Sequence, residues 1–93
     1  MNRLDLFVND REISRLCQAL VKAGAVGYSV VRHVTGRGVA GEVSESMDFS
    51  GLGANAQVIV FCDDTVLAAA RLAVKPLLQR FGGVAFVSRA EVF

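Results

Sequence analysis

The sequence predicts an α+β domain whose elements run strand–helix–strand–strand–helix–strand, which is the ferredoxin-like arrangement. Three observations predict it. Short apolar runs indicate four strands, two stretches with apolar residues at helical spacing indicate two helices, and glycines lie at the turns between these elements. The 93 residues contain no low-complexity segment and no break in composition. The chain, residues 1–93, is therefore expected to form a single domain.

The first strand and the first helix differ in their apolar period. Apolar residues alternate over 3–8, which predicts a strand with one buried face. Asn9 or Asp10 can cap the helix that follows, and Gly24 is its expected end. The residues that helical spacing places on its apolar face are Ile13, Leu16, Cys17, Leu20 and Val21.

The other three strands are bounded by glycines or charged residues. A β-branched segment predicts the second strand over 28–35. The third, over 57–62, is continuously apolar from Val58 to Cys62, so we expect it to be central with both faces covered. Gly82 and Gly83 turn the chain into the last strand, 84–89.

The second helix is expected to begin at Asp63 or Asp64, whose carboxylates can cap it. Pro76 predicts a kink or an end near Lys75, because proline removes a helical hydrogen bond. The residues expected to share its apolar face are Val66, Ala70, Ala73, Leu77 and Phe81.

Composition excludes several classes of protein. Lys and Arg outnumber Asp and Glu by only 10 to 9, which argues against a nucleic-acid binder. The start of the chain does not resemble a secretory signal, and no apolar run is long enough to span a membrane. Cys17 and Cys62 are too few for a disulfide framework, so a reducing cytoplasm is expected. A chain this short and 53% apolar is expected to cover part of its surface by forming an oligomer.

A long connection, 36–56, separates the second and third strands, where a hairpin needs only a few residues. It is rich in glycine, serine and acidic residues and has no periodicity of its own, which favours a mobile binding loop. Its base, 36–41, formally matches a dinucleotide-binding glycine pattern but does not open a helix. Glycines that flank Arg37 nevertheless predict backbone contacts to phosphate or another oxyanion.

Other candidate residues favour structural roles. His33 is the single histidine and lacks partners for a metal site. Cys17 and Cys62 are expected in the core, and Arg80 and Arg89 flank the glycine turn, where they are potential anion contacts. No group of residues suits chemical catalysis, so the sequence predicts a binding protein and not an enzyme.

Taken together, the motifs resemble the PII signalling proteins over nearly the whole chain. The segment 24–30 resembles the start of that family's second strand, 36–38 the base of its T-loop, and 60–64 the end of its third strand. The segments 80–86 and 89–93 resemble the PII-like proteins of inorganic-carbon metabolism, which are encoded beside bicarbonate transporters or carboxysomes.

The resemblance implies a homotrimer that binds adenine nucleotides in the clefts between subunits. The T-loop base would hold the phosphates, the backbones of Phe7 and Val60 would face the adenine, and the glycine turn would close over the phosphates. The residues it places in the nucleotide site are Phe7, Gly36, Arg37, Gly38, Val60, Gly82, Gly83 and Arg89. Arg37 and Gly38 are candidates for bicarbonate.

Two departures from the family bear on the ligand. Val84 stands where PII proteins carry a phosphate-binding lysine, and the chain ends before the place of their C-terminal arginines, with Arg89 as the nearest substitute. Fewer cations predict a preference for ADP or AMP over ATP.

The resemblance also implies a regulated partner, such as a membrane transporter for bicarbonate. No metal, resident cofactor or nucleic acid is expected. The alternative is a ferredoxin-like module that binds a small molecule or metal without sensing nucleotides.

Overall fold

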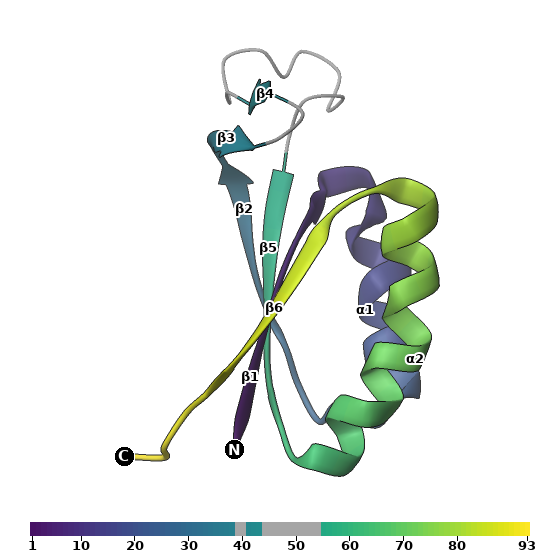
Figure 1. Cartoon of the computed structure of the whole chain (residues 1–93), viewed down its shortest axis with the longest axis vertical. Helices are drawn as coiled ribbons and strands as arrows, with labels where there is room; N and C mark the ends of the chain where they lie inside the picture. Colours follow the sequence, from purple (N-terminus) through teal and green to yellow (C-terminus); the bar gives the residue numbers. More distant parts are fainter. Residues whose placement is uncertain (39–40, 44–54) are drawn as a thin grey trace.

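The computed structural model describes residues 1–38, 41–43 and 55–93. Figure 1 shows one sheet with both helices on one of its faces. The sheet has four antiparallel strands in the order β2-β5-β1-β6, which confirms the ferredoxin-like arrangement. Its elements are β1 (Asn2–Asn9), α1 (Ile13–Lys22), β2 (Ser29–Val34), β5 (Asn55–Cys62), α2 (Asp64–Phe81) and β6 (Val84–Arg89).

The core lies between the sheet and the two helices. On β1 the predicted alternation is confirmed, because Leu4, Leu6 and Val8 are buried beneath the helices while the residues between them are partly exposed. Val58 and Val60 of β5 lie beside them and are also buried. Burial of these side chains supplies most of the free energy that holds the helices on the sheet.

Helix α1 ends where the sequence predicts but begins later, at Ile13, and neither Asn9 nor Asp10 is its own N-cap. The side chain of Asn9 accepts a hydrogen bond of 3.0 Å from the Arg11 backbone N–H and so caps the short 3-10 turn, Asp10–Glu12, that leads into α1. Gly24 has a φ of +109°, which suits glycine at the end of a helix. Placing Val21 on the apolar face was wrong, because its side chain lies beyond the edge of the core and is 56% exposed.

Helix α2 is capped by Asp63, whose carboxylate accepts a hydrogen bond of 2.8 Å from the Val66 N–H. The expected end near Lys75 is wrong, because the helix continues to Phe81. Proline removes one backbone hydrogen bond, but Leu77 and Leu78 beyond it pack against the core and hold the last turns in place.

Strand β5 is central, as predicted, since it lies between β2 and β1. The expectation that both its faces are covered is wrong for the single chain. The helices cover one face only, and Phe61 on the opposite face is 49% exposed. The continuous apolar run therefore indicates that the second face of β5 is covered by something other than the helices of the same chain.

The connection between β2 and β5 has structure at its base. β3 (Gly36–Gly38) and β4 (Gly41–Val43) pair as a short antiparallel hairpin, and β5 begins at Asn55, so the expectation of a loop without regular structure is wrong there. The register of β2 on β5 shifts between Val31 and Val34, where His33 has a φ of +61°. The remaining residues of the connection, 39–40 and 44–54, lie outside the described residues, and so does the prediction that they bind a partner.

Candidate functional site

The turn between α2 and β6 is pressed against the end of β1. Gly82 and Gly83 have φ values of +83° and +117°, which side chains rarely tolerate. A Cβ at Gly83 would lie 2.9 Å from the carbonyl oxygen of Phe7 and 3.0 Å from Cγ1 of Val8. At Gly82, by contrast, a Cβ would meet no described atom within 4 Å. Gly83 therefore packs closely against β1, whereas Gly82 has open space beside it.

An aromatic pair lies beside this turn, on the sheet face that the helices do not cover. The rings of Phe7 and Phe86 meet edge to face, with their centroids 6.4 Å apart and an angle of 71° between their planes. Val84, directly across the strand pair from Phe7, is 45% exposed. The glycine turn thus has an apolar wall of the kind on which a planar ring can stack.

The loop base lies at the same end of the sheet as the glycine turn but at the opposite edge (Figure 1). β3 extends from β2, whereas the turn leads into β6, and β5 and β1 separate these two edges. The structure therefore brings Phe7, Gly82 and Gly83 together but leaves Gly36 and the backbone of Arg37 across the sheet.

Gly38 ends β3 and so lies with Gly36 at the loop base, whereas two other predicted residues, Val60 and Arg89, lie toward the other end of the sheet. Val60 pairs with Leu4, and Arg89 pairs with Asn2 at the far end of β6 from the glycine turn. The Arg89 guanidinium donates a hydrogen bond of 2.9 Å to the Asn2 side chain and is 3.5 Å from the Asp64 carboxylate. A hydrogen bond from Asn2 and the charge of Arg89 lower the pKa of Asp64.

A polar network that no local sequence pattern predicts lies on the open sheet face. Asp5 accepts hydrogen bonds of 3.0 and 3.1 Å from the Arg3 guanidinium and one of 3.0 Å from the Gln57 amide. The hydrogen bonds from Arg3 lower the pKa of the Asp5 carboxylate, although partial burial opposes them. The signal is the register, because Gln57 reaches Asp5 diagonally from the neighbouring strand.

Both cysteines are buried, as predicted. Burial raises the pKa of the Cys17 and Cys62 thiols, so neither is an activated nucleophile. Across the described ranges, no three His, Cys, Asp or Glu residues gather as a metal site would need. None of the described helices combines the length and the apolar character that crossing a bilayer requires.

Two grooves lie on the helix side of the molecule. One, of about 570 Å³, runs between α2 and β6, and the other, of about 640 Å³, lies between α1 and β2. In the described part of the chain, neither is lined by any of the predicted nucleotide-site residues.

The comparison with solved structures supports the fold. CPII, a nitrogen regulatory PII-like protein from Thiomonas intermedia K12, bound to ADP, AMP and bicarbonate, superposes with a TM-score of 0.85 at 21% identity, over 94% of this chain and 82% of CPII. CPII bound to ADP and bicarbonate gives a TM-score of 0.80 at 22% identity, with the same coverage of both chains. Identities this low show a common fold.

The sequence comparisons point the same way. No curated protein matches the chain. The model of the family described as Nitrogen regulatory protein P-II, however, matches residues 1–93, and the predicted resemblance to PII-like proteins is confirmed. The protein belongs to the nitrogen regulatory protein P-II family.

Proposed function

We propose that this chain is a PII-like signalling protein without enzymatic activity, which binds ADP or AMP, together with bicarbonate, at the clefts between subunits of a homotrimer. The nucleotide state would set its contact with a cytoplasmic face of a partner such as a bicarbonate transporter. Membership of the P-II family supports this proposal, and CPII, the related fold, is bound to ADP, AMP and bicarbonate.

The observation that carries the proposal is the glycine turn seated on the Phe7 carbonyl, beside the Phe7–Phe86 pair. Open space at Gly82 leaves room for a phosphate to approach the backbone. The aromatic wall offers an apolar surface to adenine. Val84, in place of the phosphate-binding lysine of PII proteins, leaves one cation fewer at the turn, which favours ADP or AMP over ATP.

A trimer would complete the site. Within one chain the loop base and the glycine turn occupy opposite edges of the sheet. The loop base of one chain can therefore meet a glycine turn only if that turn belongs to a second chain. The open sheet face carries Phe61 and Phe86, which are 49% and 57% exposed. We infer that the single domain, 1–93, packs this face against its copies. Arg37 and Gly38 at the loop base remain the proposed contacts for phosphate and bicarbonate.

The proposal is tested by thermal unfolding and calorimetric titration of the full chain with AMP, ADP, ATP and cyclic AMP, each with and without bicarbonate. ADP or AMP at a hundred times its Kd should stabilise the protein by about 2.7 kcal/mol, and bicarbonate should enlarge the shift. Arg37→Ala should reduce both effects, whereas the control Lys22→Ala, at the end of α1, should leave them unchanged. Unfolding curves that no nucleotide moves would refute the proposal and favour the ferredoxin-like module without nucleotide sensing.

A further inference from the structure

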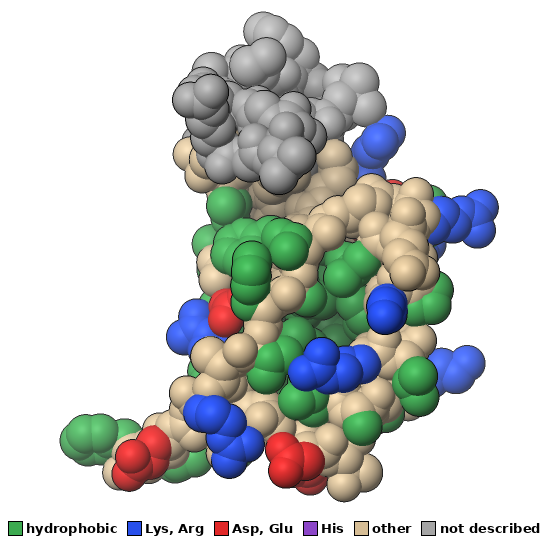
Figure 2. All heavy atoms as spheres, in the orientation of Figure 1, with side chains coloured by type: hydrophobic (Ala, Val, Ile, Leu, Met, Phe, Trp, Pro, Cys, Tyr) green, Lys and Arg blue, Asp and Glu red, His purple; other side chains and the backbone are tan. Residues whose placement is uncertain are grey.

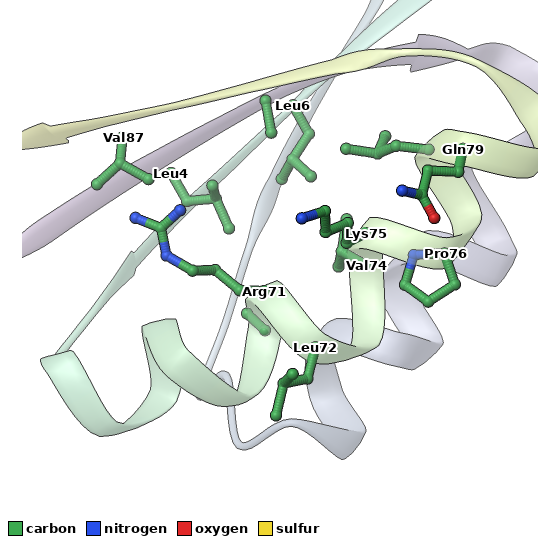
Figure 3. A pocket seen from close by; sticks show the side chains of 12 residues that line it. Leu4, Leu6, Arg71, Leu72, Val74, Lys75, Pro76, Gln79 and Val87 are labelled. Atoms are coloured by element: carbon green, nitrogen blue, oxygen red, sulfur yellow. The ribbon is translucent and has the colours of Figure 1, made fainter.

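The groove between α2 and β6 is lined mainly by aliphatic side chains, and the buried Leu4 and Leu6 lie at its base. Figure 3 shows Leu4 and Leu6 between the helix and the edge strand. The hollow arises where small side chains, Ala70 on α2 and Ala85 on β6, stand in positions that larger residues would fill. Its volume of about 570 Å³ lies in the range typical of small-molecule sites. Val87 at its edge is 39% exposed.

Two cations lie along one wall of this groove. Arg71 and Lys75 are one helical turn apart on α2, and Figure 3 shows both side chains extending from the helix toward the strands. Figure 2 shows apolar side chains inside the hollow and basic side chains around it. No acidic residue is among the described residues that line the groove, and neither cation forms an ion pair with any of the described side chains. By contrast, Arg3, Arg15 and Arg32 each pair with a carboxylate.

An aliphatic lining below two unpaired cations complements a ligand with an aliphatic body and an anionic end. The described residues that line the groove include no aromatic side chain that could stack on a purine, which distinguishes this groove from the wall beside the glycine turn. From Arg71 to Gln79 the helical rise gives the groove a length of about 12 Å. That length suits an extended chain of medium size.

We propose that the groove between α2 and β6 binds an aliphatic carboxylate of medium chain length. The chain lies along Ala85 and Val87, above the buried Leu4 and Leu6, and the carboxylate is held by Arg71 and Lys75. The planar guanidinium of Arg71 suits a carboxylate because it can donate two parallel hydrogen bonds. The groove lies between α2 and β6, on the side of the sheet that carries the helices. It lies apart from the glycine turn, and the inference does not depend on nucleotide binding.

The test is a titration of the full chain with decanoate, below the concentration at which it forms micelles, followed by methyl NMR and calorimetry. We expect saturable shifts of the methyl signals of Leu4, Leu6 and Val87. Octanoate, which has two CH₂ groups fewer, should bind at least tenfold more weakly, because each buried CH₂ contributes about 0.8 kcal/mol. Decyltrimethylammonium, with the same chain and opposite charge, should not bind.

Variants separate this site from general hydrophobic binding. The double variant Arg71→Gln/Lys75→Gln should weaken decanoate binding at least tenfold with little change in Tm, since both side chains are exposed. Lys22→Gln, which removes a charge from the end of α1, is the matched control and should bind as the parent does. Ala85→Leu should fill the groove and abolish binding, and the double variant keeps the test decisive if that protein does not fold.

Three results would overturn the proposal. The first is an absence of saturable binding to the parent protein. The second is binding that is equally tight in the double variant, which would mean that the two cations do not hold the carboxylate. The third is a change of oligomeric state in the groove variants without any decanoate binding, which would make the groove an interface between copies of the chain. Light scattering on the same samples distinguishes that last case.

Discussion

Among the glycines of the described residues, Gly83 is the most closely surrounded. A Cβ there would approach the Phe7 carbonyl oxygen and the side chains of Val8 and Leu78 to within 3.1 Å, and the φ of +117° disfavours any side chain. Gly83→Ala should therefore cost about 2–4 kcal/mol of unfolding free energy, from strain and crowding together. Gly82→Ala, with the same kind of φ but open space, should cost about 1 kcal/mol. Urea unfolding measures both, and an equal loss at the two positions would contradict the close seat on β1.

The Asp5 network predicts a pH dependence at the residue scale. Hydrogen bonds from Arg3 lower the pKa of Asp5 in the folded protein, so its contribution to stability is present above the pKa of the unfolded chain, about 4. That contribution is lost as pH falls through the folded value. Asp5→Asn should therefore lower stability near pH 7 by up to about 1 kcal/mol, and the difference from the parent should shrink as pH falls below about 4. Urea midpoints measured across this range check it, and a difference independent of pH would mean that the charge is not involved.

At the scale of elements, Pro76 is a local cost that the packing of α2 overcomes. The helix runs through it to Phe81, and Pro76 itself is exposed. Pro76→Ala should restore a backbone hydrogen bond to the Leu72 carbonyl and raise the unfolding free energy by about 1–3 kcal/mol. Lys75→Ala, its exposed neighbour, serves as the control and should change stability little. A Pro76→Ala protein that is no more stable than the parent would show that the helix already accommodates the missing bond.

The elements that the sequence predicts well are those whose pattern depends on contacts within the chain. The alternation of Leu4, Leu6 and Val8 and the caps at Asn9 and Asp63 are local signals, and the structure confirms them. The prediction that Val21 lies on the buried face of α1 was wrong, because helical spacing alone does not show how far the core extends along that face.

The candidate site was harder to predict than the elements. Gly82 and Gly83 were identified from a turn signal, but their contact with Phe7 depends on strand order. The groove cations Arg71 and Lys75 carry no sequence signal, since exposed charges one helical turn apart are common on solvated helices. Their significance appears only once β6 is placed beside α2.

At the scale of the whole molecule, the two faces of the sheet differ because the helices cover only one of them. The helix side holds the core, whereas the other side exposes Phe61 and Phe86 around the Asp5 network. Phe86→Glu should therefore shift the protein from the proposed trimer toward monomer, because it places a charge where apolar area would be buried. Leu72→Glu is a matched control, since Leu72 is 81% exposed on α2. Light scattering measures the mass of both, and a trimer that survives Phe86→Glu would place the interface elsewhere.

The irregularity at His33 has a consequence for how this protein can vary. Val31 pairs with Gln57 and Val34 with Asn55, so three steps along β2 match two along β5. Side chains alternate between the two faces of a strand. One extra residue in β2 therefore moves every later side chain to the opposite face of the sheet. The number of residues between Val31 and Gly36 thus determines the direction in which Gly36 and β3 leave the sheet, whatever contacts they then make. A single deletion between Val31 and Gly36 would therefore turn the hairpin of β3 and β4 over relative to the sheet.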